Sequence, residues 1–318
     1  MENILEYLKE ERSQEWRAEL RKSMKAKERT SRERVNMPEA DPDQRNKNNM
    51  EVNSGLPQEN AILEAQRCLD CPDPTCMSGC PVGINIPKFI KKIEAKDFLG
   101  AAVVLKETNG LPAVCGRVCP QEKQCEASCF YTIKLNKPAV AIGYLERFAA
   151  DYERESGKMA VPEVADKNKI KVGVVGSGPA GLAAAGDLAK FGYDVTVFEA
   201  LHEIGGVLKY GIPEFRLPNE IVDVEIDNLR KMGVKFKTNF LVGKTVSFDD
   251  LKKEGYQAFF VGSGSGLPRF MNIPGENYNG IFSSNEYLTR VNLMHAASDE
   301  YDTPVISGKN VAVIGGGN

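Results

Sequence analysis

The sequence predicts a helical domain that carries cysteines, followed by a domain of the α/β class, and two observations support this division. All eight cysteines fall between Cys68 and Cys129, with helical segments between and after them. From Ile170 onward, apolar strands alternate with helices, which is typical of a βαβ unit. We therefore expect four segments: a charged arm over residues 1–55, an all-α domain over 56–152, an α/β domain over 168–308 and the opening of a further domain over 309–318.

Length and charge exclude several classes of protein. The 318 residues suffice for about two domains, each with its own core. With 41 Lys and Arg against 44 Asp and Glu, the formal net charge is −3, so the chain has no overall positive field for a nucleic acid. The N-terminus lacks the apolar core of a signal peptide, and no run approaches the roughly 20 apolar residues that cross a bilayer. We therefore expect a cytoplasmic protein that binds neither nucleic acid nor membrane.

The elements follow in chain order from hydrophobic periodicity. Residues 1–55 begin like an amphipathic helix and continue as a polar segment rich in Asn, Asp and Pro, so we expect an extended arm outside the core. Helical patterns follow at 58–66, 84–105 and 140–150. A polar linker at 153–168 then separates the helical domain from the alternating strands and helices. This change of pattern predicts a domain boundary.

The cysteines form two groups with short internal spacing. The first group reads C-x2-C-x4-C-x3-C-P, and the second reads C-x3-C-P-x4-C-x3-C. Close spacing with flanking prolines lets several thiolates converge without a regular element between them, as a cubane iron–sulfur cluster requires. Two four-thiolate zinc sites are the alternative, although only one C-x2-C pair occurs. Disulfides fit a small secreted domain better than this long chain without a signal peptide.

A glycine-rich turn joins the first strand of the α/β domain to its helix. The motif G-x-G-x-x-G uses Gly176, Gly178 and Gly181, and the following strand ends at Glu199. This Rossmann-type turn presents backbone amides to a pyrophosphate at a helix N-terminus, and the acidic residue accepts hydrogen bonds from a ribose. A glycine turn without a nucleotide is the alternative. The expected contacts are Gly176, Ser177, Gly178, Pro179, Ala180, Gly181 and Glu199.

Later glycine segments could bring backbone amides near the same dinucleotide. One follows Ile204, and another follows the strand that ends at Val261, where an ordinary strand end is the alternative. The candidate contacts are Gly205, Gly206, Val207, Leu208, Arg216, Gly262 and Gly264. Residues 311–318 resemble the opening of a second unit built from a strand and a glycine turn.

Taken in this order, the motifs resemble those of the small, NADPH-oxidising subunit family of glutamate synthase. The resemblance rests on the two cysteine groups, the GSGPAGL turn, the stretch IGGVLKYGIPEFRLP and the GSGSG turn, and it covers nearly everything after the arm. Within the arm, RVNMPEADP looks like the lead-in of the homotetrameric NADPH form. The same module occurs in the flavin subunit of NADH-dependent ferredoxin:NADP oxidoreductase and in the N-terminal part of dihydropyrimidine dehydrogenase.

The resemblance implies three kinds of cofactor: FAD, two [4Fe–4S] clusters and NADPH. It places one cluster on Cys76, Cys80, Cys125 and Cys129. It places the other cluster on Cys68, Cys71, Cys119 and Glu146. The alternative for Glu146 is a solvated helix carboxylate, and Cys115 is left as a thiol that binds no iron. The NADPH contacts implied at the end of the chain are Gly315 and Gly317.

The implied activity moves electrons from NADPH through FAD and the clusters to the FMN of a glutamate synthase large subunit, or to an equivalent acceptor. That large subunit makes glutamate from glutamine and 2-oxoglutarate. FAD is required because NADPH delivers two electrons together, whereas a cluster accepts one at a time. A homo-oligomer is a further expectation. The chain looks truncated at the first turn of its NADPH domain, so we expect no NADPH oxidation by this chain; a zinc-binding, non-catalytic scaffold is the alternative from another class.

Overall fold

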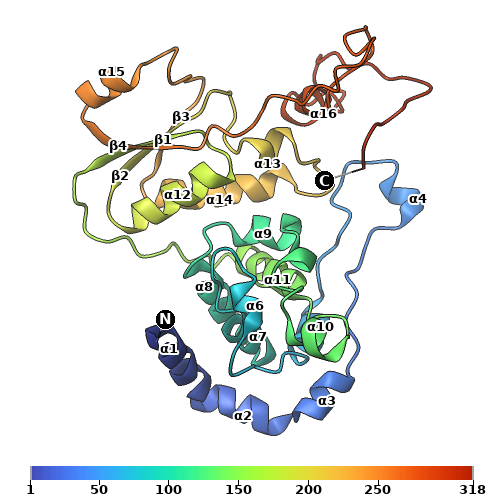
Figure 1. Cartoon of the computed structure of the whole chain (residues 1–318), viewed down its shortest axis with the longest axis vertical. Helices are drawn as coiled ribbons and strands as arrows, with labels where there is room; N and C mark the ends of the chain where they lie inside the picture. Colours follow the sequence, from blue (N-terminus) through green and yellow to red (C-terminus); the bar gives the residue numbers. More distant parts are fainter. Residues whose placement is uncertain (1, 317–318) are drawn as a thin grey trace.

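The computed structural model describes residues 2–316 and shows a helical part packed against an α/β part (Figure 1). The predicted fold class, an all-α domain followed by a Rossmann-type α/β domain, is confirmed. None of the helices in the described part of the chain is long and apolar enough to cross a membrane.

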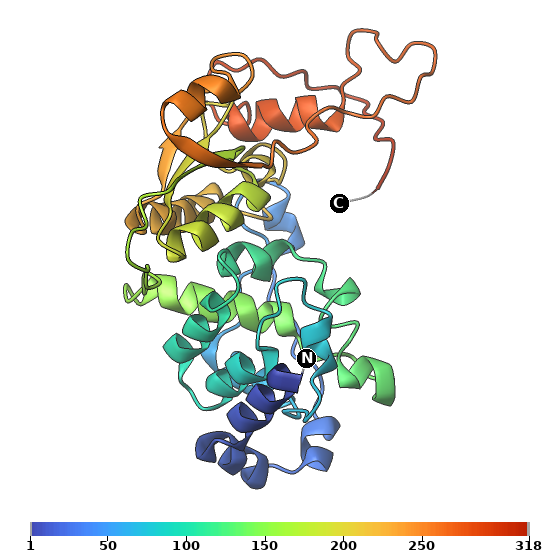
Figure 2. The same cartoon turned by 60° about the vertical axis from the view of Figure 1, so that its left-hand side comes forward.

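The N-terminal arm is helical and packs on the domain that carries the cysteines. Its helices α1 (Glu2–Ser13), α2 (Glu15–Ser23) and α3 (Ala26–Ser31) curve along the outer side of that domain (Figures 1 and 2). Residues 2–31 of the predicted extended arm are therefore helical and partly buried, with Arg17 and Arg29 only 3% and 2% exposed. Their guanidinium groups pair with buried carboxylates of the helical domain, and a buried charge requires such a partner.

The helical domain consists of short helices around one apolar core. Its elements are α4 (Pro42–Arg45), α5 (Gln58–Ala65), α6 (Thr75–Ser78), α7 (Ile86–Glu94), α8 (Phe98–Lys106), α9 (Pro112–Val118), η1 (Gln121–Lys123), α10 (Phe130–Leu135) and α11 (Ile142–Glu155). The helical pattern predicted at 84–105 is interrupted, because Lys96 has a left-handed backbone with φ of 64° and Asp97 caps the next helix by accepting from the Gly100 amide.

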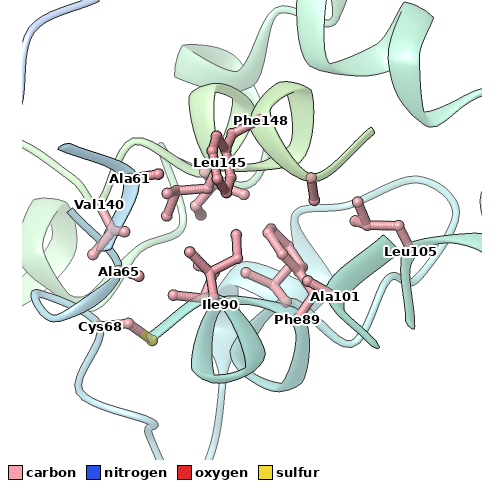
Figure 3. Packing of buried hydrophobic residues seen from close by; sticks show 14 of the residues in the cluster. Ala61, Ala65, Cys68, Phe89, Ile90, Ala101, Leu105, Val140, Leu145 and Phe148 are labelled. Carbon is pink, nitrogen blue, oxygen red and sulfur yellow. The ribbon is translucent and has the colours of Figure 1, made fainter. Parts of the chain in front are cut away.

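Figure 3 shows how this core reaches the cysteines. Phe89 and Ile90 of α7 face Leu145 and Phe148 of α11, and Cys68 lies at the edge of the same cluster. Apolar residues at three- and four-residue spacing on each helix produce this packing. Cys68, Cys125 and Cys129 therefore belong to a packed core, with Cys76 and Cys80 packed against it.

The α/β domain contains a four-stranded parallel sheet in the order β3-β2-β1-β4. The strands are β1 (Lys171–Val175), β2 (Asp194–Phe198), β3 (Lys235–Lys237) and β4 (Tyr256–Val261). The helices are α12 (Pro179–Lys190), α13 (Val207–Tyr210), α14 (Asn219–Lys231), α15 (Phe248–Lys253) and α16 (Ser284–Leu288), followed by one π turn, η2 (Thr289–Leu293). Helices α12 and α14 pack on one face of the sheet, and α15 packs on the other face through Leu251.

The two domains share a continuous interface at α9. Val114 of α9 belongs to the same apolar cluster as Ile221 of α14 and Leu182 of α12. The buried Glu225 of α14 also accepts a hydrogen bond from the Ala113 amide at 3.1 Å. The helix that leads to Cys119 is therefore held directly by the α/β domain.

Residues 262–316 extend from the end of β4 and lie at the end of the molecule opposite α1–α3 (Figure 2). The strand predicted at 311–314 is not formed: these residues belong to no sheet, and Val311 and Val313 are 73% and 84% exposed. The physical reason is that a strand needs a hydrogen-bonded neighbour. The predicted contact Gly317 lies outside the described residues.

Candidate functional site

One group of cysteines lines a single cavity in the helical domain. Its four thiols are Cys68, Cys71, Cys76 and Cys129, and apolar side chains such as Ile86 and Ile90 complete the wall. The Thr75 hydroxyl donates to the Ser128 carbonyl oxygen at 2.6 Å, which ties α6 to the turn before Cys129. This hydrogen bond brings the first and second cysteine groups of the sequence together.

The remaining cysteines lie near Glu146 of α11. Burial raises the pKa of Cys125 to about 12, and the charges of Glu126, Glu146 and Cys80 add to this effect. Burial also raises the pKa of Glu146 to about 8, with a further contribution from Cys119. Glu146 is therefore a buried carboxylate, not a solvated one, and it lies close enough to Cys119 and Cys125 to feel their charges.

A buried amide orients the Glu146 carboxylate. Asn109 donates through Nδ2 to Glu146 Oε1 at 2.8 Å, and its Oδ1 accepts from the Leu111 amide and from the Cys115 thiol. The hydrogen bond between Cys115 and Cys119 lowers the pKa of Cys119 and raises that of Cys115. Asn109 belongs to no recognisable sequence motif, so its contact with Glu146 is apparent only in the folded structure.

The cavity is lined by cysteines from both of the ligand sets that the resemblance implies. The predicted sets were Cys76, Cys80, Cys125 and Cys129, and Cys68, Cys71, Cys119 and Glu146. Cys76 and Cys129 line it together with Cys68 and Cys71. The charges of Cys80 and Glu146 contribute to the raised pKa of Cys125, and that of Cys119 contributes to the raised pKa of Glu146. Cys76 lies within α6, whereas Cys80 follows the C-cap Gly79 of that helix.

The donor set around the cavity consists of four thiols. Thiols that line a cavity can each bind a different iron of a cluster. Burial, with the charges of Cys68 and Cys129 next, raises the pKa of Cys71 to about 12, so the thiolate form requires a bound cation. The cavity therefore fits an iron–sulfur cluster.

The glycine turn after β1 has the geometry that the motif predicts. Gly176 has φ of 98°, and a side chain there would overlap the Gly262 carbonyl oxygen. A Cβ on Gly181 would overlap the Gly176 carbonyl oxygen, so α12 lies directly against the turn. A Cβ on Gly178 would meet no atom within 4 Å. The open backbone at Gly178, at the N-terminus of α12, leaves room for a phosphate.

Glu199 lies where the motif places it but is already engaged by the backbone. Its Oε2 accepts from the Ser177 amide at 2.9 Å, and its Oε1 accepts from the Leu201 amide at 2.8 Å. The Ser177 hydroxyl in turn accepts from the Gly205 amide at 2.9 Å. Glu199 therefore holds two glycine segments together at the carboxyl ends of β1 and β2.

The other predicted contacts differ in how close they lie to this glycine turn. Gly206 approaches the turn, since its Cβ would lie 2.8 Å from the Gly178 Cα. Gly205, Gly206 and Gly264 all have positive φ. Val207 and Arg216 are exposed, whereas Leu208 is buried in the core. Pro179 and Ala180 form the first turn of α12, and Gly315 lies in the exposed C-terminal segment. The structure thus brings three glycine segments together: 176–178, 205–206 and the turn at 262.

Comparisons with known proteins match both domains. The family model described as dihydropyrimidine dehydrogenase domain II, 4Fe-4S cluster, matches residues 45–158. The family model described as pyridine nucleotide-disulphide oxidoreductase matches residues 170–318.

Several curated proteins are similar over most of this chain. The NAD-dependent dihydropyrimidine dehydrogenase subunit PreT of Escherichia coli (strain K12) is 44% identical over 213 residues, which are 66% of this chain and 51% of that protein. The glutamate synthase [NADPH] small chain of the same strain is 36% identical over 85% of this chain and 57% of its own length. The small chain of Azospirillum brasilense is 34% identical, with coverages of 84% and 56%. The chain therefore spans about half the length of the curated relatives it matches.

Proposed function

Because this chain belongs to the family of iron–sulfur flavoproteins that includes the glutamate synthase small chains, we propose that it is an electron-input module of that enzyme. In general terms, the family consists of NAD(P)-dependent oxidoreductases with iron–sulfur and flavin cofactors. In the proposal, electrons pass from NADPH through FAD and two [4Fe–4S] clusters to an acceptor flavin in a large subunit. That subunit would use them to make glutamate from glutamine and 2-oxoglutarate, in the cytoplasm.

The observation that supports this proposal is the packed contact between the two domains that would hold the cofactors. Helix α9 ends at Cys119, and its first turn is bound by Glu225 of the α/β domain. Electron transfer between cofactors requires that the two domains keep a fixed separation, and a shared apolar core provides this. When bound, FAD accepts a hydride and releases its electrons singly.

The chain's own residues divide into two sets of roles. We assign one cluster to the cavity with Cys68, Cys71, Cys76 and Cys129, and the other to Cys80, Cys119, Cys125 and Glu146. The amides at the start of α12 would bind the FAD pyrophosphate, since a helix N-terminus attracts anions. The glycine segments 205–206 and 262–264 would cover it. The apolar wall of the first cavity would exclude water from its cluster.

The first test is an anaerobic analysis of the purified protein, with iron, sulfide, zinc and flavin measured on one sample. About eight irons per chain are expected for two cubane clusters, as estimated from four irons in each. Cys71→Ser and Cys119→Ser should each lower the iron content by about half, and the double variant should lose nearly all of it, because the two cysteines are assigned to different clusters. Zinc without iron would refute the proposal. Equal iron in both variants and the parent would refute the assignment of ligands.

One observation favours a different partner subunit as the acceptor of the electrons. The identity to the PreT subunit, 44% over 213 residues, is higher than that to the glutamate synthase small chains. The alternative partner is therefore a subunit that acts on dihydropyrimidines. Purified complexes with each kind of large subunit separate the two proposals: nicotinamide-dependent glutamate formation supports the first, and nicotinamide-dependent pyrimidine reduction supports the second.

A further inference from the structure

Asp70 lies between Cys68 and Cys71, in the loop that supplies two thiols to the first cavity. Its side chain is fully buried, and its φ of 51° is in the left-handed region. A residue with a Cβ adopts this conformation at a cost, and the conformation persists only where surrounding contacts hold it. The sequence gives no reason for a buried carboxylate at this position. Its partners must therefore explain it.

The partners of Asp70 come from the N-terminal arm, about fifty residues earlier in the chain. Arg17 binds Oδ1 of Asp70, and Arg21 binds Oδ2 at 2.5 Å. Arg12 donates through Nε to the backbone oxygen of Asp70 at 2.7 Å. Helices α1 and α2 thus hold both the side chain and the backbone of the residue between the two cysteines. We call these four residues the Asp70 clamp.

The same loop is held at two further carbonyl oxygens. Arg29 of α3 donates to the Gln66 oxygen at 2.7 Å, and Lys91 of α7 donates to the Cys68 oxygen at 2.6 Å. Glu94 accepts from both cations and balances part of their charge. In the described part of the chain, the loop from 66 to 70 is therefore fixed by cationic side chains at every second carbonyl.

The charges around this loop do not cancel. Five cations reach it or its carboxylates, namely Arg12, Arg17, Arg21, Arg29 and Lys91. Two carboxylates, Asp70 and Glu94, oppose them. The excess is positive and partly buried, so water screens it weakly. A cluster bound by four thiolates is an anion, and its reduction adds a further negative charge that nearby cations stabilise.

We propose that the Asp70 clamp is a positioning device for the cluster bound by Cys68, Cys71, Cys76 and Cys129. It holds the Cys68–Cys71 loop in the conformation in which both thiols face the cavity, and its positive charge raises the reduction potential of that cluster. This inference rests on the ligand assignment under Proposed function. The arm, which the sequence presents as a polar extension, is then part of the electron-transfer site.

The test compares variants of opposite charge in the full-length protein loaded with its clusters. Arg17→Gln and Arg21→Gln each remove one positive charge, and Asp70→Asn removes one negative charge with little change of shape. Asparagine also tolerates a left-handed backbone. Arg17→Lys keeps the charge and loses the fork of the guanidinium group. Arg45→Gln is the matched control, because Arg45 lies in the same arm in an exposed pair with Glu39.

The measurements are iron and sulfide per chain and a redox titration followed by electron paramagnetic resonance. The two Arg→Gln variants should shift the potential of one cluster downward, Asp70→Asn should shift it upward, and Arg17→Lys and Arg45→Gln should leave it in place. A tenfold fall in the reduced-to-oxidised ratio would correspond to about 59 mV for a one-electron centre. The variants of the clamp should also lose iron faster in air than the Arg45→Gln control.

Two results would overturn the inference: shifts of the same sign in Arg17→Gln and Asp70→Asn, or potentials unchanged in both. A merely structural role would lower the iron content without this pattern of signs. The Cys71→Ser variant identifies which signal belongs to the first cluster. If the parent protein shows no cluster signal at all, the proposed function fails; if the signal is present and insensitive to the clamp, only this inference fails.

Discussion

The substitution Gly116→Ala, which adds one methyl group, tests whether the contact between α9 and α11 positions the candidate ligands Cys119 and Glu146. A Cβ at Gly116 would lie 2.5 Å from the Arg147 nitrogen and 2.7 Å from the Arg147 Cα, both backbone atoms that cannot rotate away. Since Cβ atoms essentially never approach closer than 3.0 Å, the two helices must separate by about half an ångström. Overpacking of this kind costs roughly 1–3 kcal/mol. Cys119 caps the C-terminus of α9 and Glu146 lies in α11, so the distance between these two candidate ligands should also change.

The matched control is Gly186→Ala in α12, because its nearest contact is the Leu229 Cδ2 atom at 3.0 Å, at the end of a flexible side chain. Both substitutions gain about 1 kcal/mol of helix propensity, so the difference between the two variants isolates the overpacking. Denaturant titration should show Gly116→Ala to be less stable than Gly186→Ala by about 1–3 kcal/mol. Its iron content should also be lower. Equal stability and equal iron in the two variants would refute the reasoning.

Two further predictions concern buried titratable groups. Burial raises the pKa of Glu225 to about 7, above its ordinary value of 4.5. The folded state therefore prefers the protonated form of this side chain. The stability that this preference contributes is fully present below pH 4.5 and is lost as the pH rises to about 7. The parent protein should therefore lose stability relative to Glu225→Gln between these values in unfolding titrations, and parallel profiles would contradict this. Cys115→Ser should retain the full iron content, whereas Cys119→Ser should lose about half; a loss of iron in Cys115→Ser would show that Cys115 is a ligand.

Local pattern predicted much of the fold. The strand, glycine turn and helix around Gly176 formed as expected, because chain spacing and backbone freedom alone decide a tight turn of this kind. Helix α5 begins and ends within one residue of its predicted range. The strand predicted at 311–314 did not form, because a strand depends on neighbours that spacing does not supply.

The grouping of the cysteines shows where sequence reasoning ended. Spacing predicted thiols that bind a cofactor, but not which of them line one cavity. Cys76 and Cys80 are four residues apart, yet the turn of α6 and the hydrogen bond from Thr75 to Ser128 assign Cys76 to the cavity of Cys129. The direction in which each thiol points depends on the position of its residue in the helical turn and on the packing of that turn, so it follows only from the folded structure.

Residue types and their spacing by themselves determined the order of the two domains, the cysteine groups and the glycine turn, because each depends on neighbours within a few positions of the chain. The tertiary structure alone decided the partners of Asp70, Glu146 and Glu225. These carboxyl groups are buried, and a buried polar group is stabilised only by partners that folding brings beside it. For Asp70 those groups lie about fifty residues away, on a segment for which the sequence predicted only an extended arm outside the core.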